Sequence, residues 1–328
     1  MRSNGRAWSS DEGGLKSIPP PGSLLDVGGF RLHLVTAGEG TPAVVLDAAL
    51  GASSVSWSLV QPAVAQFTRV CSYDRAGFGW SDAGPLPRTA RRIASELRTL
   101  LSIAAVPPPY VLVGHSFGGI VMRVFAHDYR ADVVGLVLVD PAHAEDWVAP
   151  APKERHKIER GVSLCRYGAA ATRMGVARAV AALVSMGAAG IARGLVKVTS
   201  RGALSREDEG ILAPIWKLPR EARAPLAQFW TQTKFFEALG SQIASICESA
   251  AEAVEAESQG YGDLPLVTIS SSDPGDYRLA QQDSLARRSS RGRHVIASNS
   301  GHWIPLDEPA LVVSEIRDMV ETVRRERA

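Results

Sequence analysis

Cysteine is scarce in this chain, and an excess of charge of either sign is absent. The three cysteines among 328 residues, Cys71, Cys165 and Cys247, are far apart and form no Cys-x-x-Cys pair or cysteine–histidine cluster. They predict no metal site, and reduced, mostly buried thiols in a cytoplasmic protein. The formal net charge of +2 gives no sign of a nucleic-acid partner. We also expect no cofactor.

Long hydrophobic runs are missing as well. The amino-terminal MRSNGRAWSSDEGG has no apolar core of a signal peptide, and we expect residues 1–22, which end in PPPG, to be disordered. The most apolar stretch, residues 176–196, carries Arg178 and Arg193, and the segment between them is shorter than the roughly 20 residues that span a bilayer. It predicts a buried or amphipathic helix, without firm membrane insertion.

What the sequence does contain is an alternation of strand-like and helix-like segments. Hydrophobic residues make up 45% and charged residues 21% of the chain, typical of a globular protein with a sizeable core. Segments with helical periodicity, clearest at 87–106, alternate with short apolar runs. These runs predict strands within 30–38, 42–51, 68–82, 110–113, 133–140, 264–273 and 293–303. The alternation favours an α/β fold, with a parallel sheet covered on both faces.

The alternation stops after Asp140. Residues 141–262 are rich in alanine and helical in pattern, and the α/β pattern resumes after them. We therefore divide the chain into a core, residues 23–140 and 263–328, and a helical cap, residues 141–262. Basic residues punctuate the first half of this cap: Arg173, Arg178, Arg193, Lys197 and Arg201. They indicate a solvated face, with an amphipathic lid that meets lipid as the alternative.

The pentapeptide Gly114-His115-Ser116-Phe117-Gly118 fits the pattern Gly-x-Ser-x-Gly. It follows an apolar strand and precedes a segment with the apolar spacing of a helix. In such a strand-to-helix elbow, a serine in a strained backbone conformation exposes its Oγ, and close backbone contacts leave no room for side chains at the glycines. The helix begins beneath the serine, so the Phe117 amide is free to stabilise an oxyanion. Ser116 is therefore predicted to be a nucleophile.

A nucleophilic serine needs a base, and His302 is the candidate. It lies in SNSGHWIPLDEP, after the last predicted strand and before the final helix. A serine followed by a histidine near the carboxyl terminus is the chain order expected of this kind of triad. His302 would take the Ser116 proton and return it to the leaving group. The other histidine at the elbow, His115, is expected to pack under neighbouring loops and to transfer no proton.

Four stretches in this order, LDAALGASSVSW, YDRAGFGWSD, GHSFGG and SGHWIPLDEP, resemble the α/β-hydrolase superfamily over residues 24–325. The resemblance implies a mostly parallel eight-stranded sheet flanked by helices, with a helical cap inserted after the sixth strand. It assigns Ser116 as the nucleophile and His302 as the base.

The resemblance also implies a second oxyanion donor in the loop around Ala48 to Leu50, from the amide of Ala49 or Leu50. Many members of the superfamily begin this loop with His-Gly, where this chain has Asp47-Ala48. In the next motif, Asp74-Arg75 is predicted to be a structural ion pair or a turn feature.

Two carboxylates compete for the place behind His302. Asp140 ends the apolar run VVGLVLVD, at the sheet edge where active sites of this fold lie, and some members of the superfamily place their acid there. Asp273 follows the seventh strand, where most members carry it. Either carboxylate would hold the His302 tautomer and stabilise the imidazolium. We favour Asp140 and keep Asp273 as the alternative.

Serine at the elbow implies an acyl-enzyme, which water activated by His302 then hydrolyses. Haloalkane dehalogenases and epoxide hydrolases of the superfamily need a carboxylate at that position. The default function is therefore a carboxylic ester hydrolase with a small, apolar acyl substrate. Hydrolysis of a thioester, lactone or amide, cofactor-free perhydrolysis, and a non-catalytic binding protein of this fold are the alternatives. Nothing in the sequence indicates the oligomeric state.

Overall fold

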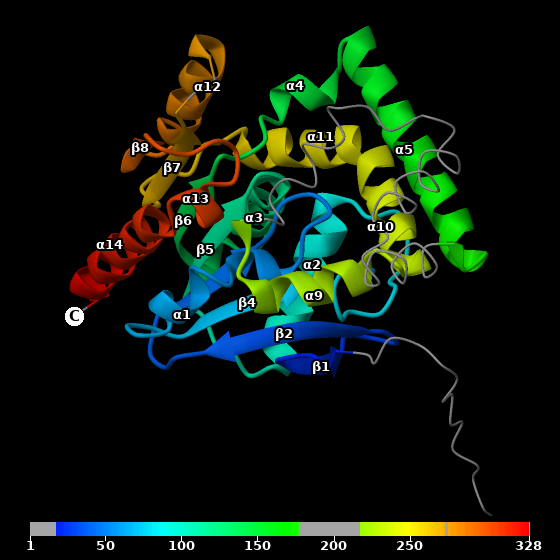
Figure 1. Ribbon diagram of the computed structural model, residues 1–328. Helices are drawn as coiled ribbons and strands as arrows, with labels where there is room; N and C mark the ends of the chain where they lie inside the picture. The colour runs from blue at the N-terminus through cyan, green and yellow to red at the C-terminus, as the bar shows by residue number, and fades with distance from the viewer. Residues whose placement is uncertain (1–17, 177–216, 273–274, 328) are drawn as a thin grey trace, which may run out of the picture.

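The computed structural model describes residues 18–176, 217–272 and 275–327, which form an eight-stranded sheet with helices on both faces (Figure 1). The strands lie in the order β1-β2-β4-β3-β5-β6-β7-β8. The pairs β1–β2 and β2–β4 are antiparallel, and all later pairs are parallel. The expected α/β fold with a mostly parallel eight-stranded sheet is confirmed.

Each of the seven predicted strand regions contains a strand of the sheet. The strand at the antiparallel edge has no predicted counterpart, because its 4 residues, SLLD, are too few to show an alternation. The strands are β1 (Ser23–Asp26), β2 (Arg31–Ala37), β3 (Ala43–Asp47), β4 (Val70–Asp74), β5 (Tyr110–His115), β6 (Val133–Val139), β7 (Leu266–Ser271) and β8 (Gly292–Ala297).

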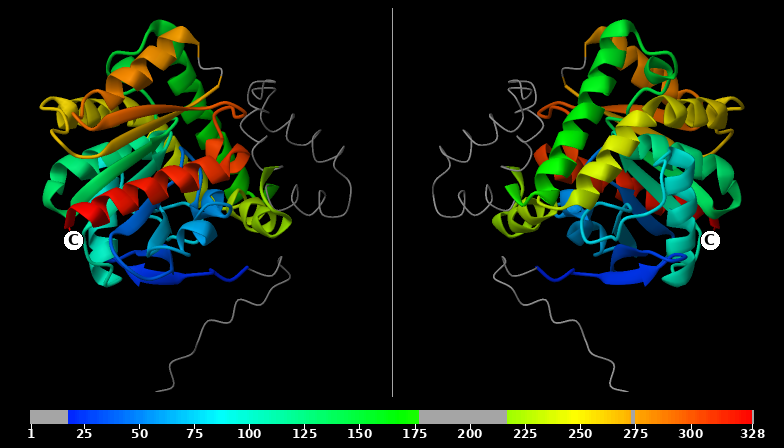
Figure 2. Two further views of the ribbon diagram at one scale, coloured as in Figure 1. Left: turned by 90° about the vertical axis from the view of Figure 1, so that its left-hand side faces the viewer. Right: turned by 90° about the vertical axis from the view of Figure 1, so that its right-hand side faces the viewer.

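Two hydrophobic cores lie on opposite faces of the sheet, and alternate residues of each strand contribute to them. In β5, Tyr110 and Leu112 belong to the core under α2 (Ala90–Ile103), α3 (Phe117–Asp128) and α11 (Ile246–Glu257). Val111 and Val113 belong to the core under α1 (Gln61–Val64) and α14 (Pro309–Arg327). Figure 2 shows these helix layers from both sides. Coverage of both faces explains why the central strands are apolar throughout.

The smaller elements connect the strands and helices of the two layers. Two short 3₁₀ helices, η1 (Ser54–Trp57) and η2 (Arg130–Asp132), follow β3 and α3, and α12 (Asp276–Ala286) lies between β7 and β8. Before α14 comes α13 (Ile304–Asp307), directly after the segment that carries His302. All three cysteines are free thiols, two of them buried, as expected.

A helical insertion lies between β6 and β7. Its described helices before α11 are α4 (Glu145–Val148), α5 (Pro152–Arg173), α9 (Arg220–Phe229) and α10 (Thr233–Ala244), and α5 packs along α10 (Figure 1). Almost all of the apolar stretch 176–196, and four of the five basic residues in the first half of the cap, lie outside the described residues, as do residues 1–17. Arg173 pairs with Glu237 of α10. Within the described ranges, no helix has both the length and the apolarity to cross a membrane.

Candidate active site

Ser116 lies at the turn between β5 and α3, in a backbone conformation that is rare for a residue with a side chain. Its φ is 54° and its ψ is −117°, and a positive φ at a non-glycine residue marks local strain. A Cβ atom at Gly114 would lie 2.5 Å from the Gly118 carbonyl oxygen, and one at Gly118 would lie 2.5 Å from the Asp47 carbonyl oxygen. The predicted elbow, with a strained serine between two crowded glycines, is confirmed.

Asp140 and His302 meet at the carboxyl edge of the sheet. His302 Nδ1 lies 2.6 Å from Asp140 Oδ2, and the backbone N–H of Ser271 donates to the other carboxylate oxygen at 3.3 Å. Because a carboxylate only accepts, His302 Nδ1 donates this hydrogen bond, and Nε2 has no hydrogen-bond partner among the described residues. The competing carboxylate, Asp273, lies outside the described residues.

Asp140 is held as an anion in spite of its burial. Its side chain is 10% exposed. Burial alone would raise its pKa, but the hydrogen bond from His302 and the charge of that ring outweigh burial, and the pKa lies below its ordinary value. An ionised Asp140 at neutral pH can orient His302 and stabilise a positive charge on the ring.

Backbone and ring contacts bring the Asp140–His302 pair to the elbow. The Ser116 N–H donates to the Val139 carbonyl at 3.0 Å, and the Ala142 N–H donates to the Ser116 carbonyl at 3.2 Å, so the loop after β6 is bound to the elbow. His115 Nε2 donates to the His302 carbonyl at 2.7 Å. The segment that carries His302 is therefore anchored on the residue next to Ser116.

His115 itself is a buried packing residue. Its ring centroid lies 4.9 Å from that of His302 and 5.2 Å from that of Trp303. Burial, with a smaller contribution from the charge of His302, lowers the pKa of His115 to about 3. The ring therefore stays neutral at physiological pH, as suits the packing role expected of it.

The predicted oxyanion donors are backbone amides at the start of α3 and in the loop after β3. The first N–H groups of α3, including that of Phe117, have no acceptor within the helix. In the loop after β3, the Ala49 and Leu50 amides have no hydrogen-bond partner among the described residues, whereas the carbonyl oxygens of Ala48 and Ala49 both accept from Arg75. The loop around Ala48 to Leu50 thus has unpaired donors on one side and paired acceptors on the other.

Asp74 and Arg75, expected to form an ion pair or a turn feature, do not pair with each other, since the two neighbours face different partners. The turn is present, because the Phe78 N–H donates to the Arg75 carbonyl at 2.9 Å. His33 Nδ1 donates to Asp74 at 2.8 Å, and Arg75 pairs with Asp47 at 2.8 Å. Successive side chains at the end of a strand point in opposite directions, which separates the two charges. The signal that was missed is that β3 and β4 both end in charged residues, and that parallel neighbours end at the same edge of a sheet.

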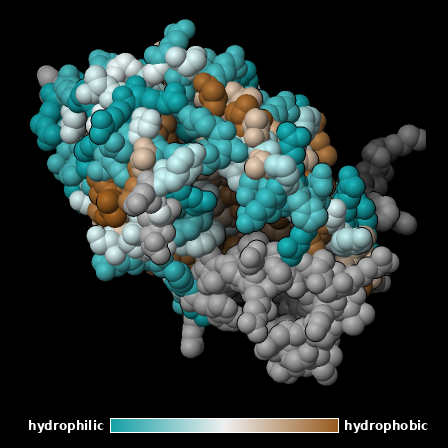
Figure 3. Space-filling view, turned by 90° about the horizontal axis from the view of Figure 1, so that it is seen from above, coloured by the Kyte–Doolittle hydropathy of each residue, from teal (hydrophilic) through white to brown (hydrophobic). Residues whose placement is uncertain are grey.

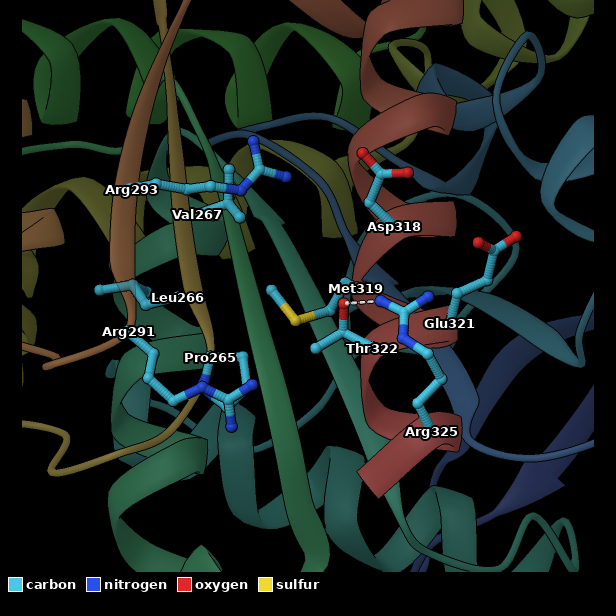
Figure 4. A pocket seen from close by; sticks show the side chains of 10 residues that line it. All are labelled: Pro265, Leu266, Val267, Arg291, Arg293, Asp318, Met319, Glu321, Thr322 and Arg325. Carbon is cyan, nitrogen blue, oxygen red and sulfur yellow. Dashed lines mark hydrogen bonds between the residues drawn. The ribbon is translucent and has the colours of Figure 1, made fainter. Parts of the chain in front are cut away.

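Away from Ser116, a groove of about 360 Å³ lies between β7, β8 and α14 (Figure 4). It is at the amino ends of these strands, whereas the residues around Ser116 follow the carboxyl ends. Two of its arginines are compensated, because Arg291 pairs with Glu326 and Arg293 pairs with Glu315. The groove is therefore separate from the candidate active site, and much of its positive charge is neutralised.

Known proteins share parts of this sequence, and solved structures share its fold. A soluble epoxide hydrolase of Corynebacterium sp. (strain C12) is 35% identical over 114 residues, 35% of this chain and 39% of that protein. A probable transporter, efuK, of Hormonema carpetanum is 36% identical over 127 residues, 36% of this chain and 18% of that protein. The chain spans less than half the length of the first curated relatives that it matches.

Solved structures extend the similarity along the chain. A thermophilic esterase from Thermogutta terrifontis has a TM-score of 0.59 at 18% identity, over 90% of this chain and 94% of that chain. At that identity the likeness shows a common fold. The model of the alpha/beta hydrolase family matches residues 44–315, which is most of the chain, and the chain therefore belongs to this family.

Proposed function

We propose that this protein is a serine hydrolase that cleaves small carboxylic esters through an acyl-enzyme, without a cofactor. The observation that supports the proposal is the arrangement at the carboxyl edge of the sheet. Ser116 has a strained, positive φ at the amino end of α3, and His302, hydrogen-bonded to Asp140, is anchored on the neighbouring His115. Such a nucleophile, base and acid are the parts that acyl transfer requires.

In the first half of the reaction, Ser116 Oγ attacks the ester carbonyl carbon while His302 Nε2 takes the hydroxyl proton. The carbonyl electron pair moves to oxygen, where the Phe117 N–H and the N–H of Ala49 or Leu50 stabilise the negative charge. Asp140 stabilises the imidazolium. When the intermediate collapses, the ester C–O bond breaks and the alcohol leaves with the proton from His302.

In the second half, water attacks the acyl-enzyme. His302 Nε2 removes a proton from the water, the same amide groups hold the oxyanion, and Ser116 leaves with the proton from the ring. The products are the carboxylic acid and free enzyme, so the cycle needs no further reactant.

An ester suits this site better than an epoxide, the substrate named for the relative from Corynebacterium. Opening an epoxide through an alkyl-enzyme ester needs a carboxylate where this chain has Ser116. An apolar substrate is supported by Leu239 of α10, whose Cδ1 would lie 3.3 Å from a Cβ at Gly51 in the loop after β3. Seen from above, apolar residues are visible in a recess next to hydrophilic residues (Figure 3).

The test uses a fluorophosphonate probe and p-nitrophenyl esters of increasing acyl length. We expect the probe to label Ser116, and Ser116→Ala to abolish labelling and lower kcat by at least about 10³-fold, because the variant has lost the nucleophile. Circular dichroism checks that the variant is folded. Folded wild-type protein that neither labels nor hydrolyses any ester would contradict the proposal and favour a binding protein.

A further inference from the structure

Arg75, which follows β4, is an almost fully buried cation that no step of the proposed reaction uses. Its side chain is 2% exposed. A buried guanidinium must be paired and hydrogen-bonded, because its desolvation is costly. The hydrogen bonds that its guanidinium donates to Asp47, Ala48 and Ala49 lie at the end of β3 and in the loop that follows it.

Three groups of that loop receive its N–H donors. Nε donates to Asp47 Oδ1 at 2.9 Å, Nη2 donates to the Ala48 carbonyl, and Nη1 donates to the Ala49 carbonyl at 3.3 Å. A planar guanidinium presents these donors in a fixed fork, so it constrains direction as well as distance. Two consecutive peptide groups are therefore held with their carbonyls toward Arg75.

The N–H groups on the opposite side of those peptide groups are the ones that the proposed reaction uses. In a trans peptide group the N–H points away from the C=O. The N–H groups opposite the Ala48 and Ala49 carbonyls belong to Ala49 and Leu50, the two candidate oxyanion donors. By holding the carbonyls, Arg75 directs both N–H groups to the far side of the loop, where neither has a partner among the described residues.

The same guanidinium also touches the other half of the oxyanion site. Its carbon lies 5.0 Å from the centroid of the Phe117 ring, a cation–π contact. Gly118 lets α3 lie close to the loop after β3, because a Cβ there would lie 2.5 Å from the Asp47 carbonyl oxygen and 2.7 Å from that of Ala48. The first turn of α3 and the loop after β3 are therefore pressed together, with Arg75 in contact with both.

A second buried arginine shows what burial alone requires. Arg88 is 0% exposed and pairs with Glu96 at 2.5 Å, and it donates to the Pro85 carbonyl at 3.2 Å. None of these contacts involves the elbow or the loop after β3. Arg88 thus shares the burial, the ion pair and a carbonyl contact with Arg75, but not the contact with two candidate donor groups.

We propose that Arg75 is a positioning residue that aligns the candidate oxyanion donors of the loop after β3, the N–H groups of Ala49 and Leu50. The inference rests on the proposed function of Ser116. Because the oxyanion forms only in the transition state, correct alignment raises kcat and leaves substrate affinity almost unchanged.

The test compares two double variants that each remove a buried arginine together with its carboxylate. Asp47→Asn/Arg75→Met removes the positioning fork without leaving an unpaired charge, and Glu96→Gln/Arg88→Met is the matched control. We expect the first to lower kcat by about 10²-fold, near the effect of losing one oxyanion donor, with KM within about threefold. The control should lower Tm and leave kcat within about twofold.

A trifluoromethyl ketone with the acyl chain of the best ester reports on the oxyanion directly, because its adduct with Ser116 carries the negative oxygen. Its inhibition constant should rise in the Arg75 double variant by about the factor that kcat falls. Arg75→Lys keeps the charge but loses the fork, and should show the same changes to a smaller degree. This single variant decides the question if the double variant does not fold.

The outcomes separate this inference from the function beneath it. Wild-type protein that is inactive toward all esters and is not labelled at Ser116 contradicts the proposed function. Active wild-type protein together with Arg75 variants of unchanged kcat contradicts the positioning role alone. Equal losses of kcat in the two double variants would also overturn it, since they would show a general loss of stability.

Discussion

Buried charges on single residues hold the loops at the carboxyl edge of this sheet. Asp74 accepts from His33 Nδ1, from the Ser54 N–H at 2.7 Å and from the Trp80 N–H at 3.0 Å. Arg75, its neighbour, holds the loop after β3. Since a buried charge that loses a partner costs several kcal/mol, these two residues restrict the conformations of both loops. The polar residues of this edge therefore hold the backbone of the two loops in place, and the loops in turn position the groups of the proposed reaction.

At the same scale, Asp140→Asn tests the acid. We expect kcat to fall by about 10³- to 10⁴-fold, because the asparagine amide neither keeps the His302 proton on Nδ1 nor stabilises the imidazolium. The fold should persist, since an asparagine oxygen still accepts from the Ser271 N–H. Steady-state hydrolysis and circular dichroism measure the two effects. Asp146→Asn, an exposed carboxylate in the same segment, is the control. Full activity of Asp140→Asn would return the role to Asp273.

Among the elements, α10 joins the insertion to the loops that surround the candidate active site. Lys234 Nζ donates to the carbonyls of Gly79 and Ser81 at 3.1 and 2.6 Å, beyond β4. Further along the helix, Ala238 packs on Gly77, where an added Cβ would lie 2.3 Å from the alanine Cβ. A movement of α10 would therefore displace the loop that begins with Arg75.

Replacement of Gly77 by alanine should displace α10. The φ of Gly77 is +88°, so the variant pays for a left-handed backbone, about 1–2 kcal/mol, and for the clash with Ala238, about 1–3 kcal/mol more. Gly175→Ala is the matched control, because Gly175 has a φ of +76° and, among the residues that the structure describes, no atom within 4 Å of an added Cβ. Urea unfolding measures both losses, and hydrogen exchange reports on α10. Equal losses of stability and unchanged exchange in α10 would contradict tight docking.

For the whole molecule, local patterns were enough to predict most strands and the elbow. An apolar run or a Gly-x-Ser-x-Gly motif lies within a few neighbouring residues, so one sequence reveals it. The sequence favoured Asp140 from its place at the end of a strand but left Asp273 open, because the contact between Asp140 and His302 joins residues 162 positions apart. The partner of Arg75 likewise depends on β3 and β4 lying side by side. Strand order and side-chain direction arise from the assembled sheet, and no local pattern contains them. The catalytic roles themselves stay predictions until activity is measured.

The folded molecule also keeps two buried histidines, His115 and His143, neutral. Burial, with the charge of His302 second, lowers the pKa of His115 to about 3, and burial, with the charge of Arg123 second, lowers that of His143 to about 4. In the unfolded chain a histidine titrates near 6.5. Between these values the unfolded chain binds protons that the folded chain does not, so the free energy of unfolding falls as the pH falls from about 6.5 toward 4.

The double variant His115→Gln/His143→Gln should therefore lose less stability in acid than the wild type. Each histidine contributes up to about 1.4 kcal/mol per pH unit within its window, and glutamine has no proton to gain there. Urea unfolding at pH steps from 7 to 4.5 measures the slope, and a glutamine amide can replace the donor that His115 offers to the His302 carbonyl. Parallel curves for the wild type and the double variant would show that carboxylates, not these two histidines, govern unfolding in acid.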